Sequence, residues 1–262
     1  MSPRTATIQH RETVMGTVVT IDLFRAGGID PRAVVGPVAR AVEALHRADR
    51  VFSTWREASP MSRLRRGEIG LGEAPPEVAD VLDACRKARD LSRGWFDPWA
   101  MPGGVDPTGL VKGWAAERAL DALRDAPLDG AMVNAAGDIT TFGGPGPGRR
   151  FRVGVVRPEA RMELATIVEV TGAIATSGTY ERGAHLIDPF TREARARVAS
   201  ATVTGADLGL ADALATALCV GGAEVLDALE AVNGYEGLTI GVDGVRAATS
   251  GFPFARALGA TA

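Results

Sequence analysis

The stretch from Asp207 to Leu218 constrains the fold of this 262-residue chain more than any other. Its sequence, DLGLADALATAL, reads as an apolar helix in which Asp212 and Thr216 lie four residues apart. That spacing places both side chains on one face of the helix. A carboxylate in an otherwise aliphatic helix is costly unless it is paired or binds a cation. Asp212 therefore needs a charged partner, a cation or exposure to solvent.

Two interpretations of this helix remain open. Carboxylate and hydroxyl oxygens on a rigid element are hard ligands that Mg²⁺ accepts, with water and substrate phosphates completing its coordination. Alternatively, Asp212 is exposed and the Thr216 hydroxyl donates back to a carbonyl of its own helix. The rest of the chain has to distinguish a magnesium site from an ordinary helix.

The strand and helix patterns predict an α+β fold with a largely antiparallel sheet. Alternating and β-branched segments predict strands at 15–24, 131–142 with a turn at Gly137–Asp138, 151–156, 165–170, 172–176, 185–188, 199–203 and 238–242. Apolar periodicity and capping residues predict helices at 31–49, 59–64, 75–92, 110–123, 207–220 and 223–231. The glycine- and proline-rich run 143–148 is expected to be a hairpin connection. Because strands and helices cluster instead of alternating regularly, the antiparallel class is favoured.

Composition excludes several functional classes. The net charge is −3 with both signs mixed along the chain, so nothing resembles the electrostatic footprint of a nucleic-acid-binding protein. No run of about 18 apolar residues predicts a membrane span, and the N-terminus lacks the apolar core of a signal peptide, so a cytoplasmic location is expected. Cys85 and Cys219 lie in apolar helical contexts and are expected to be buried packing residues.

Four polar segments at breaks in the secondary structure could carry chemistry. In DPTGLVKG, Asp106 precedes a helix and Lys112 lies in its first turns, where an anion could bind or where Asp106 simply caps the helix. In VNAAGD, Asn134 and Asp138 are typical turn residues. The segment ATSGTYER at 175–182 has hydroxyls and an arginine that could hold a pyrophosphate, although an ordinary loop would look similar. His185, in HLIDP, has the side chain of a general base, although a packing role is equally open.

Taken in order, these segments resemble the ApbE-type flavin transferases, also called FAD:protein FMN transferases. The matching pieces span roughly residues 15 to 220 and are MGT at Met15, FSTW at Phe52, FDP at Phe96, DPTGLVKG at Asp106, VNAAGD at Val133, ATSGTYER at Ala175, HLIDPFT at His185 and ADALATA at Ala211. The resemblance implies transfer of FMN from FAD to a threonine hydroxyl of an acceptor protein, with release of AMP and a requirement for Mg²⁺. It also implies one domain over residues 1–262, built from two intertwined halves related to the T-fold.

Carried over position by position, the resemblance assigns roles to individual residues. Asp212 and Thr216 match the metal-binding acid and alcohol, and Gly109 matches a residue that offers its carbonyl to the ion. His185 matches the histidine that deprotonates the incoming threonine. The positions expected to contact FAD are Met15, Trp55, Phe96, Asp97, Asp106, Lys112, Ser177 and Gly178. For Lys112, a role on the helix surface is equally open.

Some positions depart from the family pattern. Ala135 and Ala136 stand in VNAAGD where the family often has a bulkier residue and a glycine, and Pro189-Phe-Thr-Arg replaces the more usual Pro-x-Thr-Gly. Two alternatives to the transferase also stay open. One is a magnesium-dependent FAD pyrophosphatase that releases FMN and AMP, and the other is a protein that binds FAD without catalysis.

Overall fold

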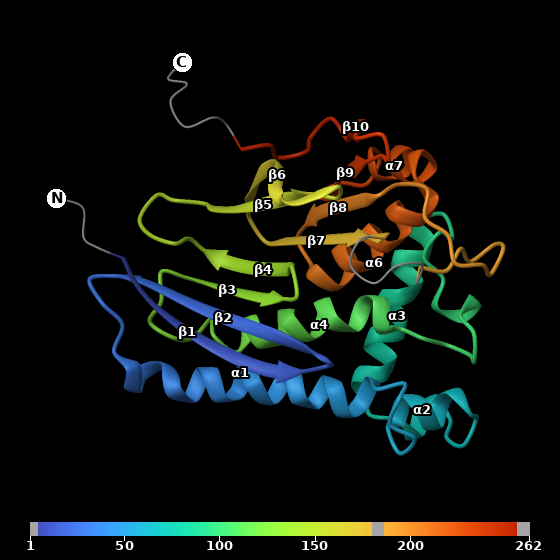
Figure 1. Ribbon diagram of the computed structural model, residues 1–262. Coiled ribbons are helices and arrows are strands. Elements are labelled where there is room, and N and C mark those ends of the chain that lie inside the picture. Colours follow the sequence, from blue (N-terminus) through green and yellow to red (C-terminus); the bar gives the residue numbers. More distant parts are fainter. Residues whose placement is uncertain (1–4, 180–185, 256–262) are drawn as a thin grey trace.

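The computed structural model describes residues 5–179 and 186–255 (Figure 1). The strands are β1 (Thr5–Val14), β2 (Thr17–Ala26), β3 (Gly130–Ala135), β4 (Asp138–Gly143), β5 (Phe151–Arg157), β6 (Ala160–Val170), β7 (Ala173–Gly178), β8 (Ser200–Gly205), β9 (Glu236–Ile240) and β10 (Arg246–Ala248). The α-helices are α1 (Pro31–Phe52), α2 (Pro60–Arg65), α3 (Pro76–Leu91), α4 (Thr108–Asp121), α6 (Leu208–Gly221) and α7 (Ala223–Leu229). Two short 3₁₀ helices are η1 (Leu71–Glu73) and η2 (Pro98–Ala100).

The strands form two antiparallel sheets. Within the described ranges, eight strands make one sheet in the order β1-β2-β3-β4-β7-β8-β9-β10, and β5 pairs with β6 in a separate ribbon. The helices and the antiparallel sheets together confirm the predicted α+β class. The division into two intertwined halves stays a prediction.

The large sheet separates two hydrophobic cores. Helices α1, α4 and α6 pack against one face, where the larger core joins their apolar side chains to those of β2, β3, β7 and β8 (Figure 1). The β5–β6 ribbon covers the opposite face, where Phe151 and Val168 pack against Ile139, Ile174 and Leu238 of the large sheet. This arrangement makes three layers, with the helices and the ribbon on opposite sides.

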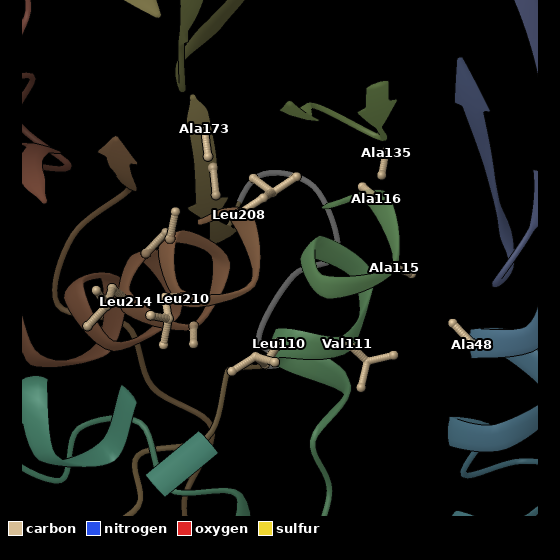
Figure 2. Packing of buried hydrophobic residues seen from close by; sticks show 14 of the residues in the cluster. Ala48, Leu110, Val111, Ala115, Ala116, Ala135, Ala173, Leu208, Leu210 and Leu214 are labelled. Carbon is tan, nitrogen blue, oxygen red and sulfur yellow. The ribbon is translucent and has the colours of Figure 1, made fainter. Parts of the chain in front are cut away.

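Helix α6 lies at the centre of the helical layer. Asp207 caps its N-terminus by accepting the Leu210 N–H at 2.7 Å, and every residue of the helix except Thr216 is buried. A helix that is apolar on all sides has to be surrounded by protein. Figure 2 shows α4 between Leu208 of α6 on one side and Ala48 of α1 on the other. Thr216 is therefore the one residue of α6 that approaches solvent.

The structure corrects several element predictions. Strand β1 was not expected, and Met15–Gly16 is the turn that joins it to β2. The 143–148 run is not a hairpin connection, because it leads from β4 in the large sheet to β5 in the ribbon. The strand predicted at 185–188 is, among its described residues, an isolated bridge between Ile187 and Ala194. Strand β10 was also missed.

The expectations for the two cysteines and for membrane-spanning helices can be compared with the structure. Cys85 and Cys219 are free and buried, which confirms their packing role, and burial raises the pKa of each thiol to about 12. Thiols with such a pKa stay protonated near neutral pH and are poor nucleophiles. Among the described residues, no helix combines the length and the apolar character needed to cross a bilayer.

Candidate functional site

A lysine lies between two buried carboxylates that come from different elements. The Lys112 ammonium of α4 pairs with Asp138 Oδ2 of β4, and its Nζ lies 3.4 Å from Asp212 Oδ2 of α6. The Asp138 and Asp212 side chains are only 4% and 9% exposed, whereas that of Lys112 is 24% exposed. Two carboxylates facing one ammonium leave a net negative charge at this place, which favours the binding of a further cation.

Strand β7 connects Asp138 to the hydroxyl of Thr216. The Thr176 N–H donates to Asp138 Oδ1 at 3.0 Å, and the next side chain, Ser177, has its Oγ 3.2 Å from Thr216 Oγ1. Thr216 lies one helical turn after Asp212, as predicted from their spacing. The Thr216 hydroxyl therefore has a hydroxyl of a neighbouring strand as a partner, and Asp212 is buried, so the interpretation of Asp212 as an ordinary exposed helix position is wrong.

These contacts, joined by the chain from Thr176 to Ser177 and by the helical turn from Asp212 to Thr216, form a group that we call the polar ring. Its members are Lys112, Asp138, Thr176, Ser177, Thr216 and Asp212. The ring draws on two helices and two strands that are widely separated in the sequence. It lies on the helical side of the large sheet, where α4 and α6 pack together.

A close helix crossing brings Lys112 to Asp212. A Cβ atom built on Gly113 would lie 2.4 Å from the carbonyl oxygen of Leu208, so only glycine allows α4 and α6 to approach this closely. Lys112 precedes that glycine, and Asp212 lies one turn after Leu208 along α6. The Lys-Gly pair of the DPTGLVKG segment therefore has a packing function as well as a charge.

A third carboxylate, the half-buried Glu117, anchors the start of α6. Glu117 Oε1 accepts the Leu208 N–H at 2.8 Å and the Thr140 hydroxyl at 2.7 Å, and so ties α4 to both α6 and β4. Burial is the main cause that raises the pKa of this carboxyl, while the two hydrogen bonds oppose the rise. Glu117 was not selected from the sequence because an acid on an amphipathic helix usually faces solvent.

Several expected FAD contacts have structural partners of their own. Asp106 Oδ1 accepts the Thr108 N–H and hydroxyl at the start of α4, and its Oδ2 lies 3.5 Å from Arg65. Asp97 caps η2 and lies 3.0 Å from Arg89. The Phe96 ring is buried, and it lies 3.1 Å from a Cβ built on Gly109. Asp106 thus holds the first residue of α4 from a position before the N-cap Pro107, and the FAD contacts of these residues stay predictions.

The other predicted residues lie at different places. Met15 occupies the β1–β2 turn with a φ of 53°, and Gly178 ends β7, one residue after the polar ring. The Trp55 ring follows α1 and is 92% exposed, so its face is accessible to a ligand. His185 lies outside the described residues. A surface pocket of about 460 Å³, lined by Phe52, Glu77 and Trp114 among others, opens between α1, α3 and α4 and includes no member of the polar ring.

The structure adds Asp138 and Thr176 to the residues selected from the sequence. Asp138 was interpreted as a turn residue, yet it begins β4 as a buried charge, and the turn is formed by Asn134, whose Oδ1 accepts the Gly137 N–H at 2.8 Å. Asp138 could have been distinguished from the turn residue Asn134 by its position directly before a run of strand-forming residues. Lys112 is paired within the site and does not occupy the helix surface.

Comparison with known proteins gives consistent results. The ApbE family model matches residues 15–104 and 101–239. A protein named FAD:protein FMN transferase from Vibrio cholerae serotype O1 is 34% identical over 131 residues, which cover 46% of this chain and 39% of that protein. A protein of the same name from Rhodobacter capsulatus is 34% identical over 170 residues, covering 58% of this chain and 32% of that protein. The chain thus spans well under two thirds of the length of these relatives.

Solved structures share the fold over most of their length. Flavin transferase ApbE from Vibrio cholerae superposes with a TM-score of 0.80 at 22% identity, covering 94% of this chain and 98% of that one. The ApbE protein from Thermotoga maritima gives a TM-score of 0.79 at 23% identity, with coverage of 94% and 97%. At such identities these matches establish the fold, and the family model extends over more than half of the sequence. The chain therefore belongs to the ApbE family.

Proposed function

We propose that this protein transfers the FMN portion of FAD to a threonine hydroxyl of an acceptor protein and releases AMP. The observation that carries the proposal is the polar ring, which sets buried oxygen ligands beside a cationic side chain at the accessible edge of α6. Relatives from three bacteria named FAD:protein FMN transferase support the same activity. FAD is then the substrate, and the acceptor is a protein with a suitable threonine.

The donor atoms fit Mg²⁺ as the cation of this site. Asp212 and Thr216 offer a carboxylate and a hydroxyl oxygen, and Gly109 is proposed to add its carbonyl. Mg²⁺ usually takes only one or two ligands from protein side chains and its other ligands from water and substrate phosphates. When bound, Mg²⁺ would supply charge stabilisation to the phosphate oxygens.

The protein's own groups would orient FAD and move one proton. The threonine oxygen attacks the FMN-side phosphorus, the bond from that phosphorus to the AMP phosphate oxygen breaks, and His185 accepts the hydroxyl proton. A base of this kind contributes about 10²–10⁴-fold in rate. The exposed Trp55 ring offers a stacking surface, and Met15, Phe96, Asp97, Asp106, Ser177 and Gly178 are the other proposed FAD contacts. A cytoplasmic location stays a prediction.

The direct test measures AMP release and the acceptor mass together. The protein is incubated with FAD, Mg²⁺ and candidate flavoproteins, and we expect AMP together with an acceptor heavier by one phosphodiester-linked FMN. AMP released at the same rate without any acceptor would indicate a pyrophosphatase. FAD binding without AMP under either condition would indicate a binding protein and contradict the proposal.

Asp212→Asn tests the role of the buried carboxylate. The substitution keeps the shape of the side chain but removes its charge, so we expect magnesium-dependent AMP release to fall by at least about 100-fold, as for loss of one strong electrostatic contact in an active site. Circular dichroism and thermal unfolding check that the variant is folded. A normal magnesium titration of activity in Asp212→Asn would place the cation elsewhere.

A further inference from the structure

The contacts of Lys112 suggest a role different from the FAD contact that the family resemblance implies. Its ammonium is held by two carboxylates of the polar ring, and most of its side chain is covered. The pair with Asp138 is the closer of the two, and the Lys112 Nζ to Asp212 Oδ2 distance of 3.4 Å is longer than a strong charged hydrogen bond. Lys112 is thus held mainly by Asp138 and faces Asp212 from a short distance.

We propose that Asp138 and Lys112 form a charge clamp that sets the affinity of Asp212 for a divalent cation. Asp138 is itself fixed, because it accepts the Thr176 N–H at 3.0 Å and is almost fully buried. Asp138 therefore restrains the ammonium, which would otherwise pair fully with Asp212. Both are positioning residues, since they act through Asp212. The inference rests on the proposed cation site at Asp212.

Electrostatics predicts opposite effects for the two members of the clamp. A positive charge close to Asp212 repels an incoming cation, and it does so strongly because these side chains are shielded from water. Lys112→Met removes that repulsion, so the affinity for a divalent cation should increase by about tenfold. Asp138→Asn removes a negative charge and leaves Asp212 as the one remaining carboxylate partner of Lys112 in the ring. The affinity should then decrease, also by about tenfold.

The experiment titrates Mg²⁺ and Mn²⁺, without FAD, into the wild type, Lys112→Met, Asp138→Asn and Asp212→Asn by isothermal calorimetry. Thermal unfolding without the cation accompanies each titration, because Lys112→Met leaves two buried carboxylates uncompensated and lowers stability. The nearly isosteric Asp138→Asn keeps the proposal falsifiable if Lys112→Met does not fold. We expect tighter binding for Lys112→Met, weaker binding for Asp138→Asn and none for Asp212→Asn.

Other outcomes separate the clamp from the proposed function. Wild-type binding that is lost in Asp212→Asn but unchanged in both clamp variants would overturn the clamp and leave the cation site in place. Weaker cation binding by Lys112→Met would also overturn the clamp. A loss of FAD affinity in Lys112→Met with unchanged cation affinity would show that Lys112 contacts FAD instead. If the wild type binds no cation, the clamp is wrong, whereas the AMP assay still decides the proposed function.

Discussion

The half-buried carboxylate of Glu117 makes the stability of the protein depend on pH. Burial raises the pKa of its carboxyl above the ordinary value of 4.5, and the nearby charge of Asp207 raises it further, while hydrogen bonds from Thr140 and from the Leu208 N–H lower it. The folded protein therefore keeps a proton on Glu117 at pH values where the unfolded chain has lost it. That contribution to stability is fully present below pH 4.5 and is lost as the pH rises through the folded pKa.

Glu117→Gln tests this linkage, because the amide imitates the protonated acid at every pH. We expect the variant to gain stability relative to the wild type as the pH is raised from 4.5 towards neutrality. Scanning calorimetry measures the difference in melting temperature between Glu117→Gln and the wild type across that pH range. Glu57 is exposed, so the control Glu57→Gln should show little change of this difference with pH. A melting-temperature difference between Glu117→Gln and the wild type that stays constant with pH would contradict the linkage.

The role of a single residue could be predicted only where residues nearby in the sequence determine which groups surround its side chain. Asp212 and Thr216 could be paired from their spacing on one apolar helix, because helical geometry fixes which residues share a face. The partners of Asp212 could not be identified, since Lys112 reaches it through a crossing of two helices. Asp138 was interpreted as a turn residue because the sequence does not indicate that β4 is covered by α4 and α6.

At the scale of elements, the position of α6 depends on the glycine of α4 that faces it. A Cβ on Gly113 would lie 2.4 Å from the Leu208 carbonyl oxygen, a backbone atom that no rotamer change can move. The same methyl group placed on an open helix position would help the helix by reducing the conformational freedom of the unfolded chain. The packing of the two helices therefore decides whether replacing this glycine by alanine raises or lowers the free energy of unfolding.

Gly113→Ala should destabilise the protein by about 1–3 kcal/mol, since the methyl group forces α4 and α6 apart. The free energy of unfolding is measured in urea, with the slope of the transition checked for two-state behaviour. Gly72→Ala is the matched control, because a Cβ there meets no atom within 4 Å and the backbone is not left-handed. Equal stability of the two variants would show that the crossing tolerates a larger separation.

Elements with strong local signals were predicted better than their connections. Helices α1 and α3 begin next to prolines, and α2 begins after the Ser59 cap, so their starts were predicted to within about one residue. Strand β1 was missed because it is polar and only partly buried at the sheet edge. Glycines and prolines at 143–148 correctly indicated a turn, but turn residues do not show which strands they connect.

At the scale of the whole molecule, the large sheet lies between the polar ring and the β5–β6 ribbon. Substitutions in the ribbon are therefore expected to change stability without changing the chemistry of the site. The polar ring lies on the helical side, whereas Phe151 of β5 packs on the other side with Phe24, their ring centroids 5.3 Å apart. A two-stranded ribbon is marginal on its own, so β5 and β6 depend on this packing. Residues on opposite faces with no shared partners usually act additively.

Phe151→Ala should therefore lower the free energy of unfolding by about 3–5 kcal/mol, because it empties a buried aromatic site. The affinity of the folded variant for Mg²⁺ should match that of the wild type in the same calorimetric titration. Val242→Ala, at a side chain that is 90% exposed, is the control and should change stability by less than about 0.5 kcal/mol. If Phe151→Ala does not fold, Phe151→Leu makes a smaller cavity and allows the same comparison. A change in cation affinity with either Phe151 variant would mean that the ribbon positions the polar ring through the sheet, and the two faces could not be treated as independent.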